Sequence, residues 1–239
     1  MRFTARPLVP LVVALVAVSV TQTVARADYV WATVESGTVR FALLENANAA
    51  PNPQFEKYVA GLSPSYDGKP LTLGSTKEGA YYASLPTGRS AGKSVVIAEK
   101  VVGVRERDGE TYLLVYHAKG AVSLAAAKTI TKAPAEVAAR RDKEKLVISV
   151  FQEGKPVPNS EIWVQWPGDE TASSVQTDSK GEVQVPWSTK GSGFISIRAK
   201  VNEVKTGEHE GKPYPKVRRW ATLAFPIEGT KAPATAIPQ

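Results

Sequence analysis

The chain has 239 residues, no cysteine, a single methionine and a formal net charge of +7. The missing cysteines exclude disulfides, thiolate metal sites and cysteine nucleophiles. The basic residues are dispersed, whereas a nucleic-acid surface needs a concentrated patch. We therefore exclude nucleic-acid binding, and we expect the fold to be stabilised by hydrophobic burial.

The first 27 residues have the three parts of a secretory signal peptide. Arg2 and Arg6 precede an apolar run over 8–20, and Ala25-Arg26-Ala27 matches a cleavage site. The apolar run is shorter than the roughly 20 residues of a membrane span. We expect cleavage before Asp28, which leaves 212 residues (239 − 27) with a net charge of +4 (27 basic, 23 acidic) and no membrane span. A retained N-terminal anchor is the alternative.

Residues 28–128 have the pattern of an N-terminal β domain. The stretches "YVWATV" and "TVRFALL" are β-branched and aromatic, and a Glu-Ser-Gly turn separates them. The segment 52–62 predicts one helical turn, because Phe55, Val59 and Leu62 recur at helical spacing. Asp67-Gly68 predicts a turn, and Asp108-Gly109 predicts the tip of a longer hairpin.

Residues 129–143 interrupt this alternation. They are rich in Ala, Lys and Arg and contain Pro134. We predict a linker here, with a short helix over 135–141, and we place the domain boundary in it. The following residues, 144–228, alternate clearly: "GFISIRAKV" puts Ile195 and Ile197 on one face and Arg198 and Lys200 on the other.

The strand and turn spacing of 144–228 is typical of an immunoglobulin-like β-sandwich. The predicted fold class is therefore all-β, with two β domains of which the C-terminal one is immunoglobulin-like. The tail, residues 229–239, lacks apolar bulk, and we expect it to be disordered.

Two groups of stretches carry a family resemblance. "EGKPVPNSEIWVQWPG", "VQTDSKGEVQVPW" and "GFISIRAKV" resemble the sandwich modules of the carboxypeptidase-regulatory, transthyretin-like and collagen-adhesin B types. With "YVWATVESGTVRF" and "GEHEGKPYPKVRRWATLAF" added, the pattern resembles an exported bacterial domain-of-unknown-function family. Some of its members are labelled as periplasmic components of nickel or cobalt uptake systems. The resemblance implies a periplasmic or secreted protein and names nickel or cobalt as the conceivable ligand. Asp28 and Arg219 stand where many relatives have histidines.

Glu208, His209 and Glu210 are the candidate metal ligands, because nickel and zinc favour imidazole with carboxylates beside it. Consecutive side chains in an extended loop alternate in direction, so a compact site needs a bent backbone or a further ligand such as His117. Two other interpretations stay open. The loop is a solvated hairpin tip, or Glu208 or Glu210 pairs with Arg218 across the hairpin.

Trp163 and Trp220 lie on the strand faces opposite to their apolar neighbours. Exposed there, they form a stacking platform for sugar rings or a contact surface for a protein, together with Tyr214 and Arg218 of the 206–220 hairpin. The alternative is that both indoles cover the apolar edge between the two domains.

Catalysis has little support in the sequence. A serine triad needs a histidine base, and the chain has only His117 and His209 and no G-x-S-x-G elbow. Converging carboxylates remain possible for any acidic pair. We predict an exported, non-enzymatic binding or accessory protein of the bacterial envelope, linked through the resemblance to divalent metal uptake. The alternative is a structural or surface-interaction module that binds a protein or a glycan. The sequence does not determine the oligomeric state.

Overall fold

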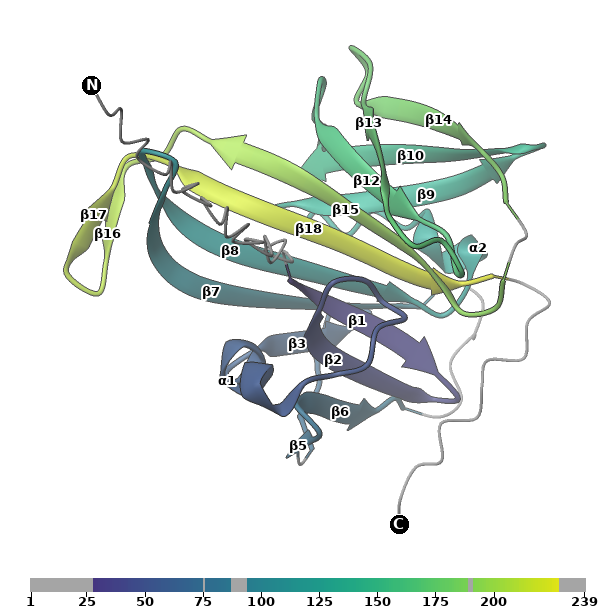
Figure 1. Cartoon of the computed structure of the whole chain (residues 1–239), viewed down its shortest axis with the longest axis horizontal. Helices are drawn as coiled ribbons and strands as arrows, with labels where there is room; N and C mark the ends of the chain where they lie inside the picture. Colours follow the sequence, from purple (N-terminus) through teal and green to yellow (C-terminus); the bar gives the residue numbers. More distant parts are fainter. Residues whose placement is uncertain (1–27, 75, 87–93, 189–190, 228–239) are drawn as a thin grey trace, which may run out of the picture.

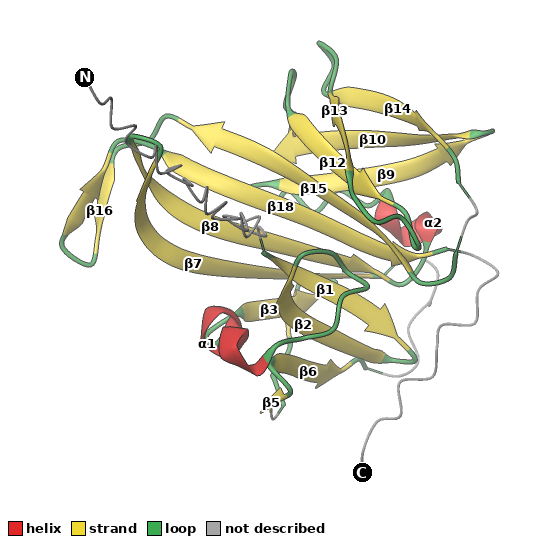
Figure 2. Ribbon diagram, in the orientation of Figure 1, coloured by secondary structure: helices red, strands yellow, loops and turns green. Residues whose placement is uncertain are grey.

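The structure is a computed structural model that describes residues 28–74, 76–86, 94–188 and 191–227. The predicted signal peptide and the predicted disordered tail lie outside these residues. The described residues form β-strands with only a few short helical turns, so the predicted all-β class is confirmed (Figure 2). None of the described helices is long and apolar enough to cross a membrane.

The N-terminal sheet has four strands in the order β1-β2-β6-β5. The predicted hairpin is confirmed, because β1 pairs antiparallel with β2 around Ser36 and Gly37, which both have positive φ. The predicted helical turn is also present, as a 3₁₀ turn followed by α1. The bounds are β1 (Tyr29–Glu35), β2 (Thr38–Leu44), η1 (Pro53–Phe55), α1 (Glu56–Val59), β5 (Thr76–Lys77) and β6 (Ala80–Ser84).

The central sheet has eight strands in the order β13-β12-β15-β18-β8-β7-β3-β4. All its neighbours are antiparallel except β18 and β8, which run parallel from Val217↔Leu113 to Ala224↔Gly120. The predicted Asp108-Gly109 turn joins β7 to β8. The bounds are β3 (Ser63–Tyr66), β4 (Lys69–Pro70), β7 (Val95–Arg107), β8 (Glu110–Ala121), β12 (Glu161–Gln165), β13 (Ser173–Gln176), β15 (Phe194–Glu203) and β18 (Val217–Pro226).

A third sheet has the strand order β11-β10-β14, and β9 also pairs with β10. A separate hairpin of β16 and β17 leaves the end of the central sheet just before β18 (Figure 1). The bounds are α2 (Leu124–Ala127), β9 (Glu136–Asp142), β10 (Lys145–Gln152), β11 (Lys155–Pro156), β14 (Glu182–Pro186), β16 (Gly207–His209) and β17 (Lys212–Tyr214).

The linker predicted over 129–143 is wrong in its second half. Residues 136–142 form β9, which pairs with β10 along its whole length, and no helix forms over 135–141. Val137 and Ala139 bury their side chains in the core of the third sheet. Alanine favours helix in isolation, but burial and strand pairing override that preference. The small side chains also hide the alternation that would have indicated a strand.

The three sheets form layers, with the central sheet between the other two (Figure 1). Leu146 and Ile148 of the third sheet pack with Ile195, Ile197 and Leu223 of the central sheet, which confirms the predicted sandwich of the C-terminal half. On the other face, β1 lies against β8 and β18.

Close approach of β1 to the central sheet depends on Gly120. A Cβ added there would lie 2.7 Å from the carbonyl oxygen of Ala32. The central sheet contains strands of both predicted domains. It is continuous across their boundary, because β8 of the first domain pairs with β18 of the second.

Candidate functional site

An aromatic surface lies on the central sheet beside the Tyr29 end of β1. Residues that are paired in register share one face of a sheet. Trp163 pairs with Arg198, Lys200 pairs with Trp220, and Trp220 pairs with Tyr116. Four strands of the central sheet therefore contribute to one surface, and Tyr29 of β1 packs on Trp220 at its border. We call it the aromatic face and define it as Tyr29, Tyr116, Trp163, Arg198, Lys200, Arg218 and Trp220.

The rings of this face form a continuous row. The ring centroids of Trp163 and Trp220 are 5.3 Å apart with an interplanar angle of 48°, and those of Trp220 and Tyr29 are 4.8 Å apart. The Arg198 guanidinium lies over Tyr29 at 4.6 Å and over Trp163 at 5.2 Å. Both indoles are half-buried. Cation–π contacts and edge-on aromatic packing hold the rings in fixed orientations.

Arg198 is the centre of this row. Burial lowers its pKa, and the neighbouring Tyr29 and Glu45 act in the opposite direction. Its Nε is buried without a hydrogen-bond partner among the described residues. The side chain is therefore held mainly by its two aromatic neighbours, and it keeps Trp163 and Tyr29 at a constant separation.

An open polar groove adjoins the aromatic row. Asn202 is one of its lining residues. Two others form an ion pair, in which the Lys200 ammonium lies 3.2 Å from the Glu161 carboxylate. The Nε of Arg218 donates to Oδ1 of Asn202 over 3.4 Å, which connects the groove to the aromatic face. The groove is lined by Asn159, Glu161, Ser174, Val175, Gln176, Lys200 and Asn202. Amides, a hydroxyl and one ion pair thus stand beside the two indoles.

The cations around this surface are largely matched by carboxylates. Glu110 accepts from Lys216 at 2.6 Å and from Arg218, and both contacts lower the pKa of Glu110. Arg107 contacts Asp108 at 3.5 Å. The surface therefore carries more cations than carboxylates, but its cations are engaged: Lys216 and Arg218 share Glu110, and Arg198 lies on two rings.

Arg218 does not make the cross-hairpin pair that the sequence suggested as one alternative. Its guanidinium pairs with Glu110 of β8 and lies 3.9 Å from the centroid of the Tyr112 ring. The parallel pairing of β18 with β8 places these residues together. The hairpin glutamates were the wrong partners for Arg218, because β16 and β17 pair with each other outside the central sheet.

Glu208, His209 and Glu210 lie at the tip of the β16–β17 hairpin. His209 pairs in register with Lys212, and Glu210 and Gly211 form the turn with positive φ. The Nε2 of His209 is 3.9 Å from the Glu210 carboxylate, and both glutamates are exposed. In the described part of the chain, no three His, Asp or Glu side chains gather in a way that could hold a metal ion. The nickel or cobalt hypothesis therefore stays a prediction from the resemblance.

Tyr214 lies on the other face of the central sheet. Its ring packs with Leu113, Val115 and Val217. These residues alternate with Leu114, Tyr116 and Arg218, so they point away from the aromatic face. The structure thus brings Trp163, Trp220 and Arg218 together and separates Tyr214, Glu208, His209 and Glu210 from them.

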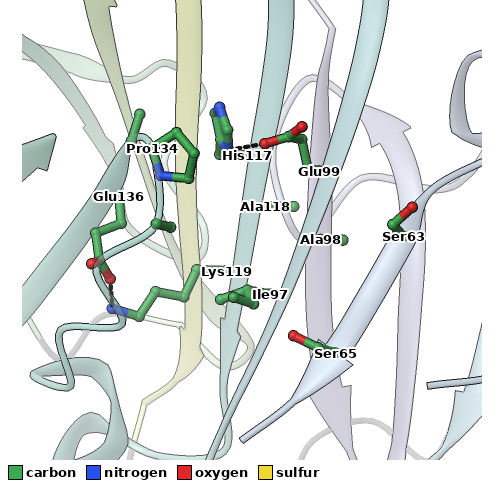
Figure 3. A pocket seen from close by; sticks show the side chains of 12 residues that line it. Ser63, Ser65, Ile97, Ala98, Glu99, His117, Ala118, Lys119, Pro134 and Glu136 are labelled. Atoms are coloured by element: carbon green, nitrogen blue, oxygen red, sulfur yellow. Dashed lines mark hydrogen bonds and ion pairs between the residues drawn. The ribbon is translucent and has the colours of Figure 1, made fainter. Parts of the chain in front are cut away.

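A cavity of about 130 Å³ lies between β3, β7, β8 and the segment 133–136 (Figure 3). Lys119 and Glu136 are each 2% exposed and form an ion pair of 3.1 Å in its wall. The Lys119 ammonium also donates to the carbonyls of Thr129 and Val137. The Glu136 carboxylate accepts from the amides of Thr131 and Lys132. This pair has no free donor or acceptor for a ligand, so it stabilises the fold.

His117 lines the same cavity and is fully engaged. Burial and the neighbouring Arg219 lower its pKa to about 3, so the ring is neutral. Arg219 Nη1 lies 3.2 Å from Nε2, which leaves the proton on Nδ1, 3.4 Å from the Glu99 carboxylate (Figure 3). Neither nitrogen is available to activate the nearby hydroxyls of Ser63 and Ser65.

The sequence interpretation missed Tyr29, Tyr116, Arg198 and Lys200 as members of the surface. The alternation of β15 already placed Arg198 and Lys200 on its polar face. It did not identify the neighbouring strand, and only the register with Trp163 and Trp220 makes these cations part of an aromatic row.

No family model matches the chain, and no curated protein matches it. Among solved structures, the chain is similar to the D0-D1 domain of Intimin at 16% identity and a TM-score of 0.25. That alignment covers 80% of this chain and 90% of that chain. It is also similar to a DUF3823 family protein from Bacteroides ovatus at 10% identity and a TM-score of 0.21, with 83% and 98% covered. TM-scores this low do not establish a shared architecture, so the fold class rests on the strand pairings described above.

Proposed function

We propose that the chain is an exported, non-enzymatic binding module of the bacterial envelope that contacts a glycan or protein partner through the aromatic face. One observation carries this proposal: the half-buried Trp163 and Trp220 stand side by side, next to a polar groove, at the border of the area that β1 covers among the described residues.

The physical properties of this surface favour binding. Large rings that are already oriented lose little conformational entropy when a partner covers them. Arg198 and the neighbouring rings hold Trp163, and strand pairing holds Arg198. Polar side chains around the rings provide hydrogen bonds that orient the partner. The surface is thus organised before any partner arrives.

The two histidines support a non-enzymatic role. Both nitrogens of His117 face charged neighbours, and its lowered pKa makes it a poor general base. His209 lies in the β16–β17 hairpin, beside Gly103 of β7. The two histidines are therefore unsuited to act as an acid–base pair. The aromatic face is suited to contact a partner.

The test is co-sedimentation of the full chain with isolated envelopes of a Gram-negative and a Gram-positive bacterium. We expect saturable binding that Trp163→Ala weakens at least ten-fold. Trp187→Ala is the matched control, because Trp187 also packs on a second indole, Trp166, at 5.3 Å and lies against an arginine, Arg141. Its substitution should leave binding unchanged.

Equal binding of the wild type and Trp163→Ala would contradict the proposal, as would a larger loss in the control. Circular dichroism of each variant shows whether it has kept its strands.

A further inference from the structure

We infer that the ligand of the aromatic face is an uncharged polysaccharide built of flat, equatorially substituted pyranose rings, such as a β-linked glucan or chitin. This inference rests on the proposed function and specifies its ligand class. It combines three features of one surface: two adjacent indoles, a groove of amides and a hydroxyl, and cations that already have partners.

The indoles suit the faces of such sugars. A pyranose with equatorial substituents presents only C–H groups on its two faces, and these are apolar enough to pack on an aromatic ring. Trp163 and Trp220 meet at 48°, so they offer two ring planes that are inclined to each other. Two successive sugars of a twisting chain can each lie on one indole.

The groove suits the edges of the same sugars. Each sugar hydroxyl donates one hydrogen bond and accepts others, so its site needs donors and acceptors side by side. Asn202 and Gln176 carry both on one amide group, and the Glu161–Lys200 pair places an acceptor next to a donor at 3.2 Å. Ser174 adds a hydroxyl, which is also both donor and acceptor.

A protein partner would use the same two indoles as anchors, because Trp, Tyr and Arg are enriched at the centres of protein interfaces. The centre of such an interface is more apolar than the surface around it. The large hydrophobic side chains that are exposed among the described residues are Val101, Ile130 and Val204. None of them belongs to the aromatic face or lines the groove. Stacking rings beside exposed amides suit a ligand that is apolar on its faces and hydroxylated at its edges.

The charges favour an uncharged ligand. Lys200 pairs with Glu161, and Lys216 and Arg218 share Glu110. The Arg198 guanidinium lies on the rings of Tyr29 and Trp163. A polyanion would compete with these carboxylates for each cation, and its binding would weaken with added salt. A neutral sugar chain uses the paired groups as they stand.

The experiment is affinity electrophoresis of the full chain in gels that contain a soluble β-glucan, glycol chitin or alginate. We expect retardation by the β-glucan or glycol chitin at low and at high salt. Trp163→Ala and Asn202→Ala should each weaken this retardation at least ten-fold, and Trp187→Ala should not change it. Asn202 is exposed, so its truncation leaves the core intact and separates lost binding from lost folding.

Retardation by alginate alone, lost on adding salt, would overturn the inference, as would retardation by none of the three. If the envelopes still bind the chain through Trp163 in that case, the proposed function stands and only the ligand class is wrong. If the envelopes also fail to bind, both proposals are wrong.

Discussion

One face of the central sheet is built in two different ways along the same strands. Where β1 covers it, β8 contributes Ala118 and Gly120, and β18 contributes Ala224. At the Tyr29 end of β1, the same strands carry Tyr116 and Trp220 at positions of the same parity, and both rings pack on Tyr29. Small side chains allow a neighbouring layer to approach closely, and large ones fill the space where that layer ends. The aromatic face is thus the continuation of a buried interface at the border of its cover.

The charges of β8 show a similar difference between covered and open positions. Lys119, on the opposite face of the strand where β9 packs, is 2% exposed and makes an ion pair whose groups are all satisfied. Glu110, at the open end of the strand, pairs with Lys216 and Arg218 in contact with solvent. A buried charge depends on its partner much more than an exposed charge does.

The largest effect is expected from Lys119→Met. It leaves the Glu136 carboxylate buried without its cation, and breaking a buried pair costs about 3–5 kcal/mol of unfolding free energy. Urea denaturation measures this loss. The double variant Lys119→Met with Glu136→Gln should recover part of it, and a loss below about 1 kcal/mol in the single variant would show that the pair is not buried.

The next effect tests the close approach of β1. Gly120→Val places side-chain atoms against the Ala32 carbonyl, so we expect a loss of about 2–3 kcal/mol from overpacking. Ser174→Val, an exposed position beside Trp163, is the matched change in the open part and should stay within about 0.5 kcal/mol. Similar losses at both positions in urea denaturation would remove the distinction between the two parts.

Acid stability tests the covered His117. The unfolded chain binds the histidine proton near pH 6.5, and the folded chain binds it only near pH 3. The unfolded state therefore binds more protons between these values, and stability falls as the pH drops through this window. The slope is up to about 1.4 kcal/mol per pH unit. We expect His117→Gln to remove this part of the slope in urea titrations from pH 7 to pH 3, and an unchanged slope would contradict the lowered pKa.

The smallest effect is expected at the open end, from Glu110→Gln. Solvent screens its pairs with Lys216 and Arg218, so the urea midpoint at neutral pH should stay nearly unchanged. The same variant adds net positive charge beside the aromatic face. A marked loss of stability would show that these surface pairs support the strand ends.

Local features were predicted well from the sequence. The hairpins at Ser36-Gly37 and Asp108-Gly109 and the single helical turn after Asn52 were all found. Such features depend on residues that are close together in the chain. Residues 136–142 were not recognised as a strand, because their alanines give no visible alternation and their pairing with β10 decides the conformation.

The site was predicted only in part. Trp163 and Trp220 were chosen because they stand opposite to apolar neighbours, and they do share one face with Arg218. Arg218 and Tyr214 were chosen as parts of the 206–220 hairpin, yet Tyr214 packs on the opposite face. Neighbours in a sequence are not neighbours in a sheet once a hairpin stands between them.

The sequence by itself determined most of the strands, their turns and the inward or outward direction of their side chains, since these follow from alternation and from residues that tolerate positive φ. Only the tertiary structure decided which strands lie side by side. The parallel pairing of β18 with β8 joins segments about 100 residues apart, and β1 covers only part of the resulting face. Burial of the whole chain selects these pairings, so the aromatic face exists only when all three layers are assembled.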